Sequence, residues 1–97
     1  MKYEFPKNFL WGTATSAHQL EGNNTKNDWW EWERSEKREK WLKAKGEDPK
    51  DFQSGRACDH YNRFETDFDL AKSLGTNAHR FSIEWSRIEP EEGKFDQ

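Results

Sequence analysis

The stretch from Phe9 to Gly22 constrains the fold of this chain more than any other part of the sequence. It begins with the apolar run Phe9-Leu10-Trp11, which has the length of a short buried β-strand. The glycine, alanine, threonine and serine residues that follow are small, so other groups can approach the backbone closely there. Gln19 and Glu21 then place hydrogen-bonding side chains just beyond the strand. We therefore predict a strand over about residues 8–14 that ends at a functional surface.

A highly charged segment over residues 28–45 predicts a helix. Asp28 is a suitable N-cap, and Gly46 is a suitable stop. Three acid–base pairs stand four residues apart with the acid first, and each such pair stabilises a helix by only about 0.2–0.5 kcal/mol. We therefore expect tryptophan side chains to anchor this helix. The pairs are Glu33/Lys37, Glu36/Lys40 and Glu39/Lys43, and the tryptophans are Trp29, Trp30, Trp32 and Trp41.

The second half of the chain predicts a helix followed by a strand. Asp59 is a suitable N-cap, and apolar residues recur at three- and four-residue steps from Tyr61 to Leu74. Gly75 ends this pattern, which gives a helix over about residues 59–74, and residues 77–85 are typical of a second strand. The order strand, inserted helix, helix, strand is that of a β-α-β unit. It implies a parallel sheet and the α/β class.

Composition limits both the core and the partners of this chain. Of its 97 residues, 36% are charged and 31% are hydrophobic, and valine is absent, so little aliphatic material is available for a core. The net charge of −3 comes with no separate basic stripe, which argues against nucleic acid as a partner. Cys58 is the single cysteine, and residues 1–6 lack the apolar region of a secretory signal. No stretch has membrane-spanning length, so we expect a cytoplasmic protein without membrane contact.

Three segments resemble glycoside hydrolase family 1, the retaining β-glucosidase and β-galactosidase family. They are Phe9–Gly22, Ala57–Tyr61 together with Arg63, and Asn77–Pro90. Residues 28–32 and the Glu84-Trp85 pair are similar to the archaeal-type branch. The resemblance implies a (β/α)8 TIM barrel, which needs about 250 residues, whereas 97 residues can hold only two strands and their connection. We therefore expect residues 1–97 to be the N-terminal fragment of a single barrel domain. Its expected partner is the remaining barrel segment, in the same parent chain or as a second chain.

The resemblance implies roles for two residues of the site. The family glutamine that matches Gln19 binds the sugar in the subsite where the bond is cleaved; the alternative is a glutamine that only satisfies loop backbone groups. The family arginine that matches Arg80 lies beside the nucleophilic glutamate, and an arginine in an apolar strand needs an anionic partner. Its alternative is a structural salt bridge. The motifs that carry the two catalytic glutamates are absent, so we expect no catalytic residue in this chain.

Five further residues are interpreted as mainly structural. We expect Glu21 to accept hydrogen bonds from backbone or arginine groups and His79 to pack against helices. Glu84 lies near the end of the second strand, where barrel active sites form, but we interpret it as a structural residue. Trp11 and Trp85 have faces that suit the apolar surface of a sugar ring, although packing is the more common role for such residues.

The implied function belongs to carbohydrate metabolism. It is hydrolysis of terminal β-D-glucosyl or β-D-galactosyl residues by double displacement, with two carboxyl groups about 5–5.5 Å apart. This chain would supply sugar recognition and is expected to be inactive alone. The reaction needs no cofactor, and the histidines show no metal-ligand spacing with Cys58. Two alternatives stay open: a non-catalytic carbohydrate-binding module that uses the tryptophans of residues 28–45, and a fragment that forms oligomers through its sheet edges.

Overall fold

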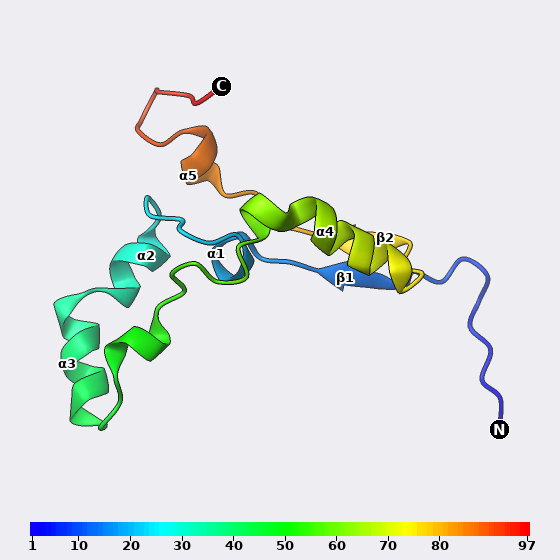
Figure 1. Ribbon diagram of the computed structural model, residues 1–97, viewed down its shortest axis with the longest axis horizontal. Helices are drawn as coiled ribbons and strands as arrows, with labels where there is room; N and C mark the ends of the chain where they lie inside the picture. The colour runs from blue at the N-terminus through cyan, green and yellow to red at the C-terminus, as the bar shows by residue number, and fades with distance from the viewer.

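The computed structural model describes all residues 1–97. It consists of a two-stranded sheet with one long helix beside it, and a separate helical lobe (Figure 1). In chain order the elements are β1 (Gly12–Ala14), α1 (Ala17–Leu20), α2 (Asp28–Glu33), α3 (Glu36–Ala44), the 3-10 helix η1 (Pro49–Phe52), α4 (His60–Ser73), β2 (Ala78–Arg80) and α5 (Trp85–Ile88).

The two strands pair in parallel, as the β-α-β order predicts. Gly12 lies opposite Ala78, and Ala14 lies opposite Arg80. The side chain of Asn77 fixes the start of this pairing, because its Oδ1 accepts a hydrogen bond from the Trp11 backbone N–H at 2.8 Å. Helix α4 makes the crossover between the strands and runs alongside them in Figure 1. The result is an incomplete α/β structure with a two-stranded sheet.

Both strands are shorter than the ranges predicted from sequence. After Ala14 the chain makes one more ladder bond, from Thr15 N–H to Arg80 C=O at 2.9 Å, and then turns into α1. The residues after Arg80 therefore have no partner strand in this chain. The predicted strand over residues 77–85 is wrong in its last part, since Trp85 begins α5. The cause is local: the Glu84 carboxylate accepts a hydrogen bond from Ser86 N–H and caps that helix.

The predicted charged helix over residues 28–45 is two helices. Ser35 separates them, because its Oγ accepts from the Arg38 N–H and caps α3 while its hydroxyl donates to the Trp32 carbonyl. The N-cap of α2 is Asn27 and not Asp28; its Oδ1 accepts from the Trp30 N–H at 2.8 Å. Two of the three predicted ion pairs form: Glu36 with Lys40 at 2.6 Å and Glu39 with Lys43 at 3.6 Å.

Helix α4 begins after Asp59, as predicted, but the Asp59 side chain does not cap the helix. Asp59 adopts a left-handed conformation with φ of 55°, and its carboxylate accepts from the side chains of Asn62 and Arg56 instead of a helix N–H. Arg63 leaves helical geometry and marks a kink in the first turn. Gly75, with φ of +74°, follows the last turn, in the conformation that glycine adopts without strain.

The chain buries very little of itself. Six of 97 residues are buried, and Leu42 in the α3–η1 lobe (Glu36–Phe52) is the only large side chain that is fully buried. The accessible surface is 8308 Å², whereas a folded monomer of this mass exposes about 5,900 Å². The radius of gyration is 18.1 Å, against about 12.5 Å for a compact chain of this length. Large apolar surfaces of the sheet and of α4 are therefore left uncovered by this chain itself.

Candidate functional site

The candidate site lies at the carboxyl ends of β1 and β2, where the two segments that follow the strands are fastened to each other. The Ala17 N–H at the start of α1 donates to Ser82 Oγ at 2.8 Å. Together with the bond from Thr15 to Arg80, this contact places α1 directly beside the chain that leaves β2. Carboxyl ends of parallel strands are the edge at which such folds carry their functional groups.

Gln19 lies in α1 with its side chain exposed. The side chain makes no hydrogen bond within the chain, although the residues on either side of it do. The alternative in which Gln19 satisfies loop backbone groups therefore has no contact to support it in this structure. Its amide is free to offer a donor and an acceptor to another molecule.

Arg80 is the last residue of β2 and is exposed. Its neighbour His79 faces α4, because its ring lies 5.3 Å from the ring of Phe68 and its Nδ1 is 2.9 Å from the Thr13 hydroxyl. This contact confirms the packing role predicted for His79. Since side chains alternate along a strand, Arg80 projects from the opposite face of the sheet. It forms no ion pair with a carboxylate of this chain.

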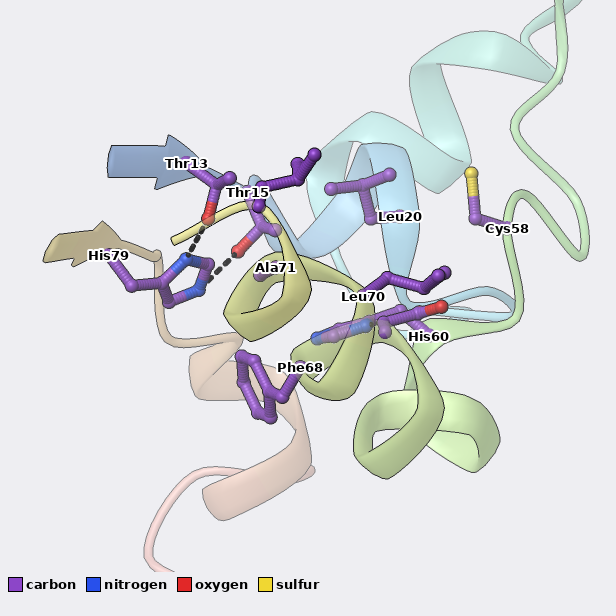
Figure 2. Close-up of a pocket in the computed structure, with 11 residues that line it drawn as sticks. Thr13, Thr15, Leu20, Cys58, His60, Phe68, Leu70, Ala71 and His79 are labelled. Atoms are coloured by element: carbon purple, nitrogen blue, oxygen red, sulfur yellow. Dashed lines mark hydrogen bonds and ion pairs between the residues drawn. The ribbon is translucent and has the colours of Figure 1, made fainter. Parts of the chain in front are cut away.

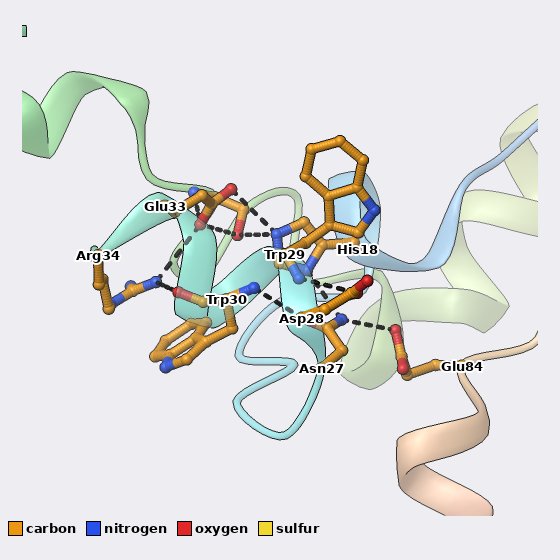
Figure 3. Close-up of polar contacts among 9 residues, drawn as sticks. His18, Asn27, Asp28, Trp29, Trp30, Glu33, Arg34 and Glu84 are labelled. Carbon is orange, nitrogen blue, oxygen red and sulfur yellow. Dashed lines mark hydrogen bonds and ion pairs between the residues drawn. The ribbon is translucent and has the colours of Figure 1, made fainter. Parts of the chain in front are cut away.

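Beside α1, five polar side chains form one connected group, here called the His18 network (Figure 3). His18 Nε2 lies 3.0 Å from Glu33 Oε1 and 3.0 Å from Ser54 Oγ. On its other side, Asn27 Nδ2 lies 3.1 Å from His18 Nδ1 and donates to Glu84 Oε2 at 2.9 Å. The network therefore joins α1, α2, the loop after η1 and the segment after β2.

The two carboxylates of this network are held in their charged form. Burial raises the pKa of Glu33, but the hydrogen bonds from His18 and from the backbone and hydroxyl of Ser54 outweigh it, and the pKa lies below its ordinary value of 4.5. Burial also raises the pKa of Glu84, and hydrogen bonds from the Ser86 and Asn27 side chains bring it below 4.5. Each carboxylate therefore acts as an acceptor at neutral pH.

Glu21 and Glu84 have the structural roles expected from the sequence. Glu21 accepts hydrogen bonds from Arg87 Nε at 2.9 Å and from Asn24 Nδ2 at 3.1 Å. Arg87 also donates to the Gly22 carbonyl at 2.8 Å. These contacts clamp the turn after α1 onto α5. Both oxygens of Glu84 accept hydrogen bonds from this chain.

The two tryptophans considered as sugar-facing walls have partners of their own. Trp11 lies 4.6 Å from the ring of Phe5 and 4.8 Å from that of Phe9, ring centre to ring centre. Trp85 donates its indole N–H to Glu89 at 2.9 Å. Both remain about half exposed, so a role as sugar-facing walls stays a prediction.

A cavity of about 330 Å³ lies on the opposite, helix-facing side of the sheet (Figure 2). Its apolar lining comes mainly from α4 and the residue after it, with Leu20 of α1, and includes Phe68 and Leu74. His60 lies on this side too and contacts Asp67 at 2.7 Å. Because the cavity lies on the helix-facing side, it is separate from Gln19 and Arg80. No group of three or more His, Cys, Asp or Glu side chains is arranged to hold a metal ion.

Sequence reasoning missed the His18 network. Its hydrogen-bonded pairs are separated by up to 57 residues, and none of its members forms a local motif with another. The one available signal was Asn27, a favoured N-cap residue that precedes the charged run.

Comparisons with known proteins place this chain among glycosidases. The sequence profile described as Glycosyl hydrolase family 1 matches residues 1–97. Beta-glucosidase A of Acetivibrio thermocellus is 39% identical over 99% of this chain and 21% of its own length. Beta-galactosidase of Pyrococcus woesei is 39% identical over 89% of this chain and 17% of its own length. The solved β-glycosidase from Pyrococcus horikoshii superposes with a TM-score of 0.73 at 48% identity, over 99% of this chain and 20% of its own.

The chain thus spans about a fifth of the length of these relatives. No helix in the structure combines the length and the hydrophobicity that a membrane span requires.

Proposed function

Because this chain belongs to glycosyl hydrolase family 1, we propose that it forms the first part of a (β/α)8 barrel that hydrolyses terminal β-D-glucosyl or β-D-galactosyl residues with retention. The names of its relatives, β-glucosidases and a β-galactosidase, support this substrate class. The parallel β1–α4–β2 unit is one repeat of such a barrel. In our proposal the protein works in the cytoplasm without nucleic acid or membrane partners.

The observation that carries the proposal is the state of Gln19 and Arg80. Gln19 follows β1 and Arg80 ends β2, so both lie at the carboxyl end of a barrel strand. Both side chains are exposed, and neither has a polar partner in this chain. Neighbouring polar side chains such as Glu21, Ser82 and Glu84 are hydrogen-bonded within the chain. Unpaired polar groups among satisfied neighbours are what a substrate site needs before substrate arrives.

The proposed chemistry divides between this chain and the rest of the barrel. Gln19 donates to and accepts from sugar hydroxyls, and so fixes the ring in the cleavage subsite. Arg80 places a positive charge where it keeps a nucleophilic carboxylate ionised and oriented. The nucleophile and the acid/base carboxyl, about 5–5.5 Å apart in a retaining enzyme, come from the remaining barrel.

The uncovered surface supports the need for that remaining barrel. This chain exposes 8308 Å², roughly 2,400 Å² more than a compact monomer of its mass. Phe64 and Leu70 of α4, Leu74 at its C-terminal end, and Phe81 and Ile83 after β2 are all exposed. Further barrel strands and helices would bury these side chains and would close the open edges of the sheet. The chain alone is therefore expected to be inactive.

The alternative of a carbohydrate-binding module on α2 and α3 has less support. A sugar would need the open faces of the tryptophans, but cationic side chains already lie over three of them. Arg34 lies 3.3 Å from the ring centre of Trp30, Arg38 lies 3.9 Å from that of Trp32, and Lys45 lies 3.9 Å from that of Trp41.

Complementation tests the proposal. The complementing polypeptide is the part of the Pyrococcus horikoshii β-glycosidase that lies outside its match to this chain. We expect the mixture to hydrolyse aryl β-glucosides and β-galactosides and neither component to do so alone. Gln19→Ala and Arg80→Ala should each lower kcat/KM by about 100-fold or more, while Arg38→Ala, in the α3–η1 lobe, should leave it unchanged.

Circular dichroism and sugar binding of the chain alone separate the alternatives. A stable fold that binds sugar and gains no activity on mixing would favour the binding module. Association that rises with concentration, without sugar binding, would favour the oligomer-forming fragment. Either result would overturn the proposal that this chain and the remaining barrel together form one active site.

A further inference from the structure

We propose that His18 is a positioning residue: a neutral imidazole, protonated on Nε2, that anchors α1 and thereby holds Gln19 in place. The second part of this statement rests on the proposed function, because it assumes that Gln19 contacts the sugar. The first part rests on the hydrogen bonds of the His18 network alone (Figure 3).

The orientation of the Asn27 amide is the first step. Its Oδ1 caps α2 by accepting from the Trp30 N–H at 2.8 Å. The NH₂ group must therefore face the other way, where it lies 2.9 Å from the ionised Glu84 and 3.1 Å from His18 Nδ1. A flipped amide would lose the cap and would set an oxygen against the Glu84 carboxylate. The cap and Glu84 thus fix which atoms of Asn27 point at His18.

The state of His18 follows from this. An amide NH₂ can only donate, so His18 Nδ1 must accept and cannot carry a proton. The single ring proton is then on Nε2, which lies 3.0 Å from Glu33 Oε1. Glu33 is suited to accept it, because its other oxygen already accepts from Ser54 and Arg34. Nδ1 therefore accepts from Asn27, and the Nε2 proton faces two acceptors, Glu33 Oε1 and Ser54 Oγ, because the Ser54 hydroxyl gives its own proton to Glu33 Oε2.

The ring is also enclosed. The side chains of His18 and Glu33 are only 13% and 10% exposed, and the indole of Trp29 lies over the imidazole with ring centres 6.5 Å apart. In such surroundings an unmatched donor or acceptor is costly, so the arrangement tolerates little movement of the ring.

The attachment of His18 fixes the position of Gln19, because the two residues are neighbours in the backbone of α1. Helix α1 is a single turn, too short to be stable by itself. It is held at Ala17 by Ser82, at His18 by the network, and just past its end by the contact of Glu21 with Arg87. Gln19 lies between these three attachments and has none of its own. His18 is the central attachment, and the only one that ties α1 to α2.

A spectroscopic experiment tests the anchor without any need for activity. The chain has three histidines, so two-bond ¹H–¹⁵N correlation spectra of ¹⁵N-histidine-labelled chain, with the complementing polypeptide unlabelled, resolve each ring. We expect the Nε2–H form for His18. Asn27→Asp keeps the cap oxygen but removes the donor, and should place a proton on Nδ1. A proton on Nδ1 in the unsubstituted chain would overturn the assignment.

Variants of His18 then separate its two contacts. His18→Gln keeps a donor near Glu33, His18→Asn keeps an acceptor near Asn27, and His18→Phe keeps only the ring shape. We expect His18→Phe to raise hydrogen exchange at the Leu20 and Glu21 amides, which bond back to residues 16 and 17, by at least about tenfold. The two partial variants should lie between. His60→Phe, in α4, is the matched control, and unchanged exchange in His18→Phe would refute the anchor.

A double-mutant cycle tests whether the anchor acts through Gln19. In the complemented enzyme His18→Phe should lower kcat/KM by about 10- to 100-fold, the scale expected when a contact group is displaced by about 1 Å. In the Gln19→Ala background the same change should have an effect of at most about twofold. An undiminished effect would refute action through Gln19. Absence of any complemented activity would instead refute the proposed function, and the exchange data would still decide the anchor.

Discussion

Gly22 offers the sharpest test of how the turn after α1 is held. It is buried and has φ of +89°, and a Cβ built on it would lie 2.2 Å from the carbonyl oxygen of Arg56. That oxygen belongs to the backbone, so it can move only if the whole loop around Arg56 moves. Gly46 has a similar φ of +79° and nothing within 4 Å of such a Cβ. The two positions therefore share the backbone strain, and only Gly22 has a close contact that a Cβ would disturb.

The expected magnitudes follow from these geometries. Left-handed backbone at alanine costs about 1–2 kcal/mol, which is the whole effect expected for Gly46→Ala. Gly22→Ala must also push the Arg56 loop away. This displacement breaks the hydrogen bond from Asn23 N–H to Gly55 C=O, 2.7 Å long, and strains the one from Arg87 to Gly22 C=O. The first bond contributes about 1 kcal/mol and the second about 1.5–3 kcal/mol. With the strain of about 1–2 kcal/mol, the total cost of Gly22→Ala is about 3.5–6 kcal/mol.

The assay is titration of each variant chain with the complementing polypeptide, followed by tryptophan fluorescence. A chain that folds as it binds shows a loss of folding free energy as weaker apparent affinity. The expected weakening is roughly 300- to 20,000-fold for Gly22→Ala and roughly 5- to 30-fold for Gly46→Ala, at 1.4 kcal/mol per factor of ten. Urea unfolding should show the same order in a chain that folds alone. Equal effects of the two variants would refute the close contact with Arg56.

Three other predictions concern the α3–η1 lobe, the contact of Arg87 with Glu21 and Gly22, and the loss of stability at low pH. Leu42→Ala should destabilise the α3–η1 lobe by about 2–5 kcal/mol. Leu74→Ala changes a side chain that is 76% exposed and should have little effect on the isolated chain. Residue-resolved hydrogen exchange measures the effect of each variant. Arg87→Ala should cost about 1.5–3 kcal/mol by removing its bonds to Glu21 and Gly22, with partial recovery in Arg87→Lys, measured by urea unfolding. Because the folded-state pKa values of Glu33 and Glu84 lie below 4.5, the stability they contribute is complete above pH 4.5 and is lost as pH falls through those lower values. Glu33→Gln should therefore make unfolding less sensitive to acid, and an unchanged acid profile would contradict this account.

Local patterns predicted the order of the elements well. The three- and four-residue spacing from Tyr61 to Leu74 and the stop at Gly75 correspond to α4, and the predicted strand ranges 8–14 and 77–85 contain the paired strands β1 and β2. These features depend on residues close together in the chain, so the sequence displays them directly. The structural roles of Glu21 and Glu84 also agree with the structure.

The features that the sequence did not predict depend on competition between alternative hydrogen bonds and on partners that are distant in the chain. Ser35 occurs within a run of good helix formers, and its capping bond breaks the run into two helices. Glu33 has Lys37 at the favourable spacing but binds His18 and Ser54 instead, because a buried carboxylate gains more from several hydrogen bonds than from one exposed ion pair. Asn27 and Glu84 meet across 57 residues, and no local pattern reveals such a pair.

The position of the α3–η1 lobe bears on how this connection can be redesigned. The lobe has its own buried residue, Leu42, and it lies in the connection between β1 and α4, away from the sheet (Figure 1). The entropy of closing a connection changes by only about 0.6 kcal/mol for each doubling of its length. Residues 36–52 could therefore be exchanged for a longer or shorter segment at little entropic cost to strand pairing, provided that Glu33 and Ser54 keep their places. The connection is thus a site at which a new surface segment can be grafted at a distance from the sheet, while the His18 network stays in place.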